Sequence, residues 1–319
     1  MPNATNADQQ ITSAFKLSTA GDVLLWHIIL LALLFASPLL INQAAAQAAT
    51  DNKSKAQQPH IQVQLIAENI SAHKSRVGIL FEPEPGWHIY WLNPGDTGLA
   101  PNISWRGSEG LKFGPLKWPM PEHIPVAHLV NYGYHGTSLL WSELSRSAGT
   151  GDNNSKHNNN SPGIVQAELS WLVCKESCVP GQASLSLDLN QLDQASSAQA
   201  GKYFAKAQAK LPKALATMQA HYWTDSDKLY IDVYFKQALF SNAARNAHTK
   251  SDIELFIKEL DLVNYSASAD VHAEHNVLRW STTLNDYYQS APDRIHAVLV
   301  LDQQQAFEFA INLKTEFNN

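Results

Sequence analysis

The chain has 319 residues, and its 45% hydrophobic content is enough for a folded core and excludes wholesale disorder. A formal net charge of −6 provides no basic surface for phosphates and argues against a nucleic-acid binder. Two cysteines are too few for a small disulfide-rich scaffold, so any cysteine chemistry involves this single pair. The length predicts two folded units in addition to an export segment.

Residues 1–48 have the pattern of an export segment. Positions 23–41 are almost continuously apolar and are followed by small residues that suit a signal peptidase. About 19 apolar residues also approach the length that spans a bilayer, so a retained N-terminal membrane anchor is the alternative to a cleaved signal peptide. Either interpretation predicts an exported chain, and in a Gram-negative cell this means the periplasm, where disulfides persist.

Residues 61–190 have the alternating pattern of a β-sandwich. A polar stretch at 49–60 precedes them and predicts a linker. Short strand-like runs then occupy 61–66, 75–81, 102–105, 137–141, 164–173 and 183–189. Many short strands without amphipathic helices between them are typical of a sandwich. Low-complexity residues 145–161 predict a surface loop within it.

The second half of the chain predicts a helix followed by more strands. Residues 194–220 have helical spacing, and Pro212 would divide them into two short helices, so 191–221 is interpreted as a helical connector. Strand-like runs resume at 228–235, 252–257, 276–280, 295–301 and 306–311. They predict a second, smaller β domain over 222–319. The expected fold class is therefore mainly β: a sandwich, a short helical segment and a second β domain.

The segment WLVCKESCVP holds both cysteines, Cys174 and Cys178, directly after a predicted strand. A disulfide between them would close a loop of about five residues, which removes only about 2 kcal/mol of unfolded-state entropy. A bridge across a hundred residues would contribute more than twice as much. The short spacing is therefore a weak way to staple a large chain, and it favours a dithiol that opens and closes.

Other kinds of cysteine site are less well supported by the residues. A metal site would need more ligands than two sulfurs and a third from His135, although reduced thiols would suit Cu(I). Lys175 would favour a neighbouring thiolate and Glu176 would oppose it, so the spacing leaves open which sulfur is the nucleophile.

Two stretches, 85–99 and 118–136, are dense in aromatic residues, glycine and proline. Core packing and turns are the ordinary explanation of such residues. An exposed Tyr-Gly-Tyr loop is different, because loops on a rigid sandwich often carry function and aromatic rings there could shield a reactive disulfide.

Four motifs in order, GWHIYWLNPGDTGLAP, WPMPE, NYGYHG and WLVCKESCVPG, together resemble the amino-terminal periplasmic domain of the DsbD family of thiol:disulfide interchange proteins. The resemblance covers residues 61–189 and is greatest to the ScsB-like branch, which the ending DRIHAVLVLDQQQAFEFAINL also resembles. It implies an immunoglobulin-like β-sandwich whose cysteine pair relays electrons to or from thioredoxin-fold protein partners in the periplasm. Since the chain has one apolar segment, a separately encoded membrane protein would supply the electrons.

The resemblance also implies roles for individual residues. Cys174 and Cys178 fall on the family's cysteine positions, and Cys178 is expected to form the mixed disulfide. The family's cap loop falls on about 130–134, and its candidate residues are Asn131, Tyr132, Gly133 and Tyr134, with Tyr132 as the expected shielding ring. Lys175, Glu176 and His135 are candidate modulators. No cofactor and no metal are expected.

The same residues are compatible with two other functions. One is an envelope binding or scaffold module with a structural disulfide, for which the redox potential would lie below about −300 mV. The other is a Cu(I)-handling protein that binds the metal through its reduced thiols.

Overall fold

The structure is a computed structural model that describes residues 53–314 except 72, 147–162, 215–218, 237–252 and 302. The predicted export segment, 1–48, and nearly all of the predicted loop at 145–161 lie outside the described residues. The described part of the chain belongs to one compact unit. Within it, no helix combines the length and apolar character needed to cross a bilayer.

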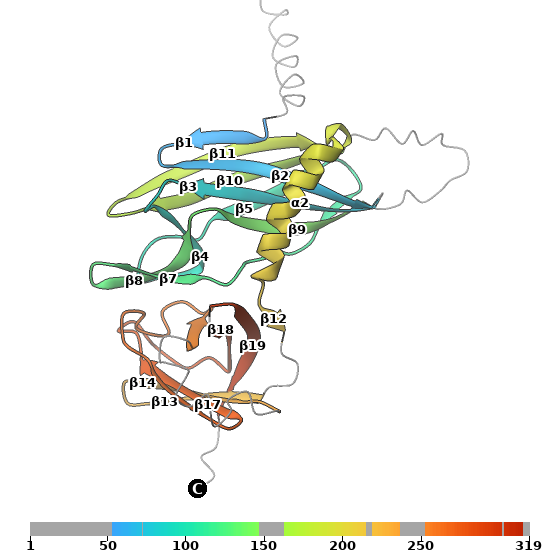
Figure 1. The fold of residues 1–319 in the computed structure, drawn as a ribbon. Coiled ribbons are helices and arrows are strands. Elements are labelled where there is room, and N and C mark those ends of the chain that lie inside the picture. The colour runs from blue at the N-terminus through green and yellow to red at the C-terminus, as the bar shows by residue number, and fades with distance from the viewer. Residues whose placement is uncertain are drawn as a thin grey trace, which may run out of the picture. The chain divides into compact units, whose positions relative to one another are not determined.

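Two sheets form the β-sandwich at the start of the described chain (Figure 1). The first has the order β1-β2-β3-β9-β6, with the bounds β1 Lys55–Gln58, β2 Ile61–Ser71, β3 Lys74–Pro83, β9 Ser138–Arg146 and β6 Leu111–Phe113. The second has the order β11-β10-β4-β8-β7, with the bounds β11 Cys178–Asp188, β10 Ile164–Cys174, β4 His88–Gly95, β8 Leu129–His135 and β7 Glu122–Val126; β5, Asn102–Gly107, also pairs with β10.

Alternation along the strands builds the core between these sheets. In β10 every second residue from Val165 to Val173 is buried, while the residues between them are partly or fully exposed. Phe81 of β3 meets Trp171 of β10 edge to face, with ring centroids 6.1 Å apart. A strand buries one face in this pattern because successive side chains point to opposite sides of the sheet. The face of β10 that carries Cys174 is therefore the outer face.

Helix α2, Gln194–Ala209, covers the outer face of the first sheet (Figure 1). Asp193 caps its N-terminus by accepting a hydrogen bond of 2.6 Å from the backbone N–H of Ser196. The helix ends at Lys210, and the chain enters β12, Lys213–Ala214. Pro212 ends this helix because proline lacks the N–H that would continue it and disfavours helical geometry before it. The prediction of a second helix after Pro212 is wrong for the described residues, because Lys213 and Ala214 pair with β19 instead.

An eight-stranded sheet follows the helix, with the order β15-β18-β19-β13-β14-β17-β16 and β12 paired to β19. Its remaining bounds are β13 Gln219–Asp225, β14 Lys228–Tyr234, β15 Ile253–Ile257, β16 Asp270–Glu274, β17 Val277–Thr283, β18 Arg294–Leu301 and β19 Gln305–Leu313. The strands predicted in this half of the chain are present, and the prediction of a mainly β fold is confirmed.

Parts of the predicted linker and of both aromatic stretches are strands instead. Within the predicted linker, β1 pairs with β2 from Lys55 to Gln58. The aromatic stretches contain β4 and β8, which pair with each other in the second sheet. Their glycine and proline content concealed this, because these residues are usually depleted in strands. Strand β4 pairs with Cys174 through His88, and β8 lies on the other side of β4.

Candidate active site

The two cysteines lie at the closed end of the hairpin formed by β10 and β11. Cys174 is the last residue of β10, Cys178 is the first residue of β11, and the two are direct partners in the antiparallel register. They are joined by a disulfide, with their Cα atoms 4.2 Å apart. The three residues between them make the turn, in which the N–H of Lys175 donates to the carbonyl of Ser177 at 3.1 Å. The hairpin itself therefore places the two sulfurs side by side.

A row of four side chains crosses the second sheet at this end. Cys178 is opposite Cys174, Cys174 is opposite His88 of β4, and His88 is opposite His135 of β8. Directly opposed residues of antiparallel strands point to the same face, with their Cβ atoms about 5 Å apart. Both cysteines and both histidines therefore share the outer face of the sheet.

The two cysteines differ in their access to solvent. Cys174 is only 2% exposed, whereas Cys178, the first residue of β11, is exposed. An incoming sulfur can therefore reach Cys178 more readily than Cys174. This asymmetry is what an exchange site requires, with one sulfur to meet the partner and one to resolve the intermediate.

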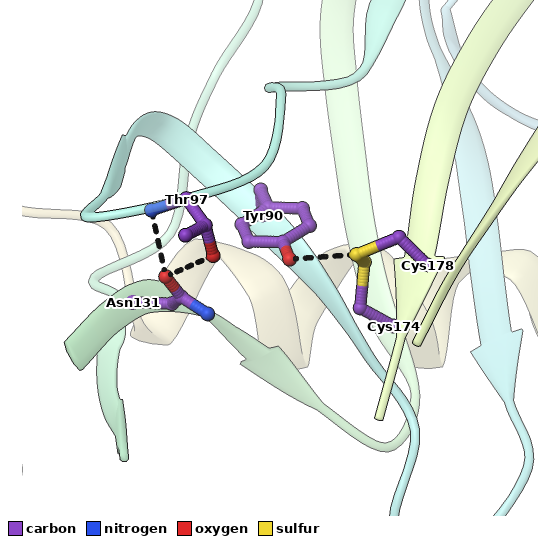
Figure 2. Close-up of a disulfide and its surroundings, with 5 residues drawn as sticks. All are labelled: Tyr90, Thr97, Asn131, Cys174 and Cys178. Carbon is purple, nitrogen blue, oxygen red and sulfur yellow. Dashed lines mark hydrogen bonds between the residues drawn. A yellow bond between two sulfur atoms is a disulfide. The ribbon is translucent and has the colours of Figure 1, made fainter. Parts of the chain in front are cut away.

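Tyr90 is the aromatic residue in contact with the disulfide (Figure 2). It lies two residues after His88 and therefore on the same face, and its hydroxyl is 3.6 Å from the Sγ of Cys178. Burial raises the pKa of Tyr90. The hydroxyl is therefore protonated at neutral pH and can donate toward the sulfur.

Residues 95–98, here called the cover segment, lie over the ring of Tyr90. A Cβ atom added to Gly98 would be 2.1 Å from the Cζ of Tyr90, so the backbone packs directly on the ring. Thr97 donates to the Oδ1 of Asn131 from its N–H, at 3.0 Å, and from its hydroxyl, at 2.9 Å (Figure 2). The cover segment explains why Tyr90 is buried although it points away from the sandwich core.

His88 is buried beside the disulfide without a hydrogen-bond partner for its Nε2. Its ring meets Tyr90 and His135 edge-on, with centroid distances of 5.2 and 5.7 Å. Burial, and then the charge of His135, lower the pKa of His88 to about 4. The imidazole is therefore neutral at physiological pH.

The structure differs from the prediction for the cap. Tyr134 is opposite Ile89 in the register and points to the sandwich core, where its hydroxyl donates to the carbonyl of Pro119 at 2.8 Å. Tyr132 points to the same side, and its ring meets Phe256 edge-on at 4.9 Å. Burial raises the pKa of both tyrosines well above the usual range. Because alternation along β8 turns them away from the disulfide, Tyr90 takes the position predicted for Tyr132.

The other two cap residues lie on the disulfide face. Asn131 is 2% exposed and anchors the cover segment through Thr97. Gly133 is opposite Tyr90, and a Cβ atom at this position would lie 2.2 Å from the carbonyl oxygen of Ile89. Only glycine permits this close approach of β8 to β4.

All three candidate modulators are exposed. Lys175 and Glu176 are exposed in the turn, and the Lys175 side chain extends along Gly86, where a Cβ atom would lie 3.4 Å from its Cε. The Nδ1 of His135 lies 3.4 Å from a carboxylate oxygen of Glu122. In the described part of the chain, no three His, Cys, Asp or Glu side chains are arranged to hold a metal ion.

Two residues of this site, His88 and Tyr90, were not singled out from the sequence. The signal that could have found them is the alternation in His88-Ile89-Tyr90-Trp91. Ile89 and Trp91 are the core-facing residues, so their neighbours had to share the other face. The pairing of β4 with β10 is a long-range contact that alternation alone does not reveal.

These features define a class of protein: a mainly β sandwich with a cysteine pair at the end of one hairpin, one sulfur buried and the other exposed. The family described as "Thiol:disulfide interchange protein DsbD, N-terminal" matches residues 55–190. The chain therefore carries a DsbD amino-terminal-like domain over these residues, as its motifs predicted.

One solved structure extends the likeness in fold beyond this domain. The N-terminal periplasmic domain of ScsB from Proteus mirabilis has a TM-score of 0.57 at 20% sequence identity, over 82% of this chain and 96% of that one. The GAE domain of GGA2p from Saccharomyces cerevisiae has a TM-score of only 0.25 at 10% identity, over 42% of this chain and 96% of that one. No curated protein matches the sequence.

Proposed function

We propose that this chain is a periplasmic thiol–disulfide interchange protein that relays electrons through Cys174 and Cys178 to thioredoxin-fold protein partners. The observation that carries the proposal is the unequal exposure of the two sulfurs within a DsbD amino-terminal-like domain. The apolar stretch near the N-terminus and the periplasmic domain named for the ScsB structure support this location.

The exchange starts from the reduced pair. The thiolate of Cys178 attacks one sulfur of a partner disulfide, which forms a mixed disulfide and releases the partner's other sulfur as a thiolate that takes up a proton. The thiolate of Cys174 then attacks the Sγ of Cys178, closes the disulfide seen in the structure and releases the partner's second thiolate, which is also protonated. Two electrons and two protons have then passed to the partner.

A second dithiol must reset the relay. A membrane-embedded donor dithiol would reduce the Cys174–Cys178 disulfide by the same two steps in reverse and become oxidised itself. No dissociable cofactor takes part in these steps. The Tyr90 hydroxyl, 3.6 Å from Cys178, is placed to donate a hydrogen bond to the thiolate that forms there.

The first test is the equilibrium redox potential of the pair in glutathione or dithiothreitol buffers. A potential of about −180 to −270 mV, in the range of known exchange proteins, is the expected result. A potential below about −300 mV, with a disulfide that resists thioredoxin-fold proteins, would instead identify a structural bridge.

Serine variants test the order of the two steps. Cys174→Ser should accumulate a mixed disulfide between Cys178 and an oxidised thioredoxin-fold protein, because no sulfur remains to resolve it. Cys178→Ser should form far less of this adduct, since Cys174 is buried. Ser177→Ala, which changes the turn without removing a sulfur, is the matched control and should exchange like the unmodified chain. Equal trapping by both cysteine variants would contradict the assigned roles.

A further inference from the structure

The cover segment, residues 95–98, is held on its other side by the eight-stranded sheet and the loop after β15. We propose that the eight-stranded sheet and the loop after β15 position the cover segment over Tyr90 and so control how readily Cys178 is reached. The inference rests on the proposed exchange function and gives the eight-stranded sheet a role in it. The residues involved are positioning residues, since none of them contacts a sulfur atom directly.

The first anchor is Asn93, just before the cover segment. Its side chain is fully buried, and its Nδ2 donates to the carbonyls of Ile257, at 2.8 Å, and Glu259, at 3.1 Å. The same nitrogen is 3.2 Å from the hydroxyl of Tyr265. Its Oδ1 accepts from the N–H of Gly95 at 3.1 Å, which fixes the start of the cover segment. A buried amide with all these partners has one favourable orientation.

The second anchor is Asp96, inside the cover segment. Its Oδ2 accepts a hydrogen bond of 2.6 Å from the hydroxyl of Ser266, in the loop between β15 and β16. It also accepts from the N–H of Val130 in β8 at 2.7 Å, and its own N–H donates to the Val130 carbonyl at 3.1 Å. Asp96 therefore binds both the loop after β15 and strand β8 of the sandwich.

The contacts continue from these anchors to the sulfur. Thr97 follows Asp96, Gly98 packs on the ring of Tyr90, and the Tyr90 hydroxyl reaches Cys178. Both glycines of the cover segment have positive φ, +85° at Gly95 and +91° at Gly98. Glycine is free to adopt other conformations, so the local sequence does not enforce this one. The long-range hydrogen bonds of Asn93 and Asp96 select it.

This arrangement has a consequence for reactivity. A thiol that attacks Cys178 has to approach a sulfur that Tyr90 and the cover segment shield on one side. With the anchors intact, a thiol approaches Cys178 from its exposed side only. Weakening an anchor lets the cover segment and Tyr90 move away from the sulfur more often, which opens a second direction of approach and should speed reduction without altering either cysteine.

The test measures the rate at which dithiothreitol reduces the Cys174–Cys178 disulfide in the full exported chain. Ser266→Ala removes one hydrogen bond to Asp96 from the far side of the contact, and Asp96→Ala removes that bond and the one to Val130. We expect reduction to be about threefold to tenfold faster in Ser266→Ala, and faster still in Asp96→Ala, as for the loss of one or two hydrogen bonds. The melting temperature of Ser266→Ala should stay close to that of the unmodified chain.

Ser268→Ala is the matched control, because Ser268 is an exposed serine of the same loop. Its reduction rate should equal that of the unmodified chain. Equal rates in Ser266→Ala, Ser268→Ala and the unmodified chain would overturn the inference, even if Asp96→Ala fails to fold. A faster rate in Ser266→Ala together with a lowered melting temperature would also overturn it, because general destabilisation would then account for the change.

The result can be separated from that of the proposed function. Dithiothreitol needs no protein partner, so the rates report on the cover segment alone. If the chain fails to exchange with thioredoxin-fold proteins but Ser266→Ala is reduced faster, the positioning role of the eight-stranded sheet is supported and the proposed relay is not. If exchange occurs and the rates are unchanged, the relay stands and the positioning role does not.

Discussion

His88 is a buried histidine beside the disulfide. It lies between Cys174 and His135 in the register, and its Nε2 is buried without a partner. A buried polar atom without a hydrogen-bond partner costs about 1–3 kcal/mol of stability.

The lowered pKa of His88 predicts a pH dependence of stability. Its folded-state pKa is about 4, below the ordinary value of 6.5, so between these values the unfolded chain binds more protons than the folded chain. The free energy of unfolding should therefore fall as the pH drops from about 6.5 to 4, by at most about 3 kcal/mol from this group. Above pH 6.5 His88 is neutral in both states and contributes no slope.

The measurement is urea unfolding at pH 7 and pH 4.5. His88→Phe removes the titrating group and the unpaired nitrogen, so it should lose less stability between the two pH values than the unmodified chain. His128→Ala removes an exposed histidine and should lose as much as the unmodified chain. The assignment fails if the loss in His88→Phe is the same as in the unmodified chain.

At the scale of elements, β4 and β8 connect the hairpin to the rest of the sandwich. Residues of β8 alternate between two tasks: Tyr132 and Tyr134 fill the core, while Asn131 and Gly133 serve the disulfide face. The irregular pairing of β4 with β8 between Tyr90 and Gly95 allows the chain to leave the ladder and form the cover segment.

Gly98 and Gly136 both have positive φ, but only Gly98 packs against another side chain, so alanine variants at the two positions distinguish backbone strain from overpacking. Gly136 has φ +65° and nothing within 4 Å of an added Cβ atom, whereas at Gly98 the added Cβ would meet Tyr90. Gly136→Ala should therefore cost about 1–2 kcal/mol, from the left-handed backbone alone. Gly98→Ala should cost about 1–3 kcal/mol more from overpacking.

The Gly98→Ala substitution should also displace the cover segment. Urea unfolding measures the two stabilities, and the rate of dithiothreitol reduction measures access to Cys178. We expect faster reduction in Gly98→Ala but not in Gly136→Ala. Equal stability and equal reduction rates in the two variants would mean that the backbone of Gly98 does not press on Tyr90.

For the molecule as a whole, helix α2 closes the outer face of the first sheet. Phe204 is fully buried there, edge-on to Trp141 at 5.8 Å, and the guanidinium of Arg76 lies 5.1 Å from its ring. The small satellite core around it consists of Ile66, Leu80, Leu139, Trp141, Ala200, Phe204 and Ala207. This core belongs to the opposite sheet of the sandwich from the disulfide.

Phe204→Ala tests whether the helix stabilises the fold without affecting the disulfide. It should lower the free energy of unfolding by about 3–5 kcal/mol, through lost burial and the cavity left behind. Lys202→Ala, at an exposed position of the same helix, should change it by less than about 0.5 kcal/mol. The redox potential of the disulfide should be the same in both variants. A shifted potential in Phe204→Ala would show that the helix contributes to the site.

Short-range patterns were enough to predict much of this fold. Alternation at 61–66, 164–173 and 295–301 predicted strands that the structure contains, because burial on one face of a sheet has a period of two residues. Alternation did not reveal β1, which is polar and is held by its pairing with β2. The helix also ended earlier than its spacing indicated, since Pro212 stops it two residues after the cap at Lys210.

The sequence by itself determined the mainly β class, the single cysteine pair and, through four motifs, the DsbD-like domain. Cysteines four residues apart on one hairpin need no distant part of the chain to meet. The tertiary structure alone decided that Tyr90 rather than Tyr132 lies against Cys178, that Asn93 binds the end of β15, and that Asp96 binds the loop after it. Those contacts join residues that are far apart in the chain, and which side chains meet depends on strand register and on the face that each strand buries.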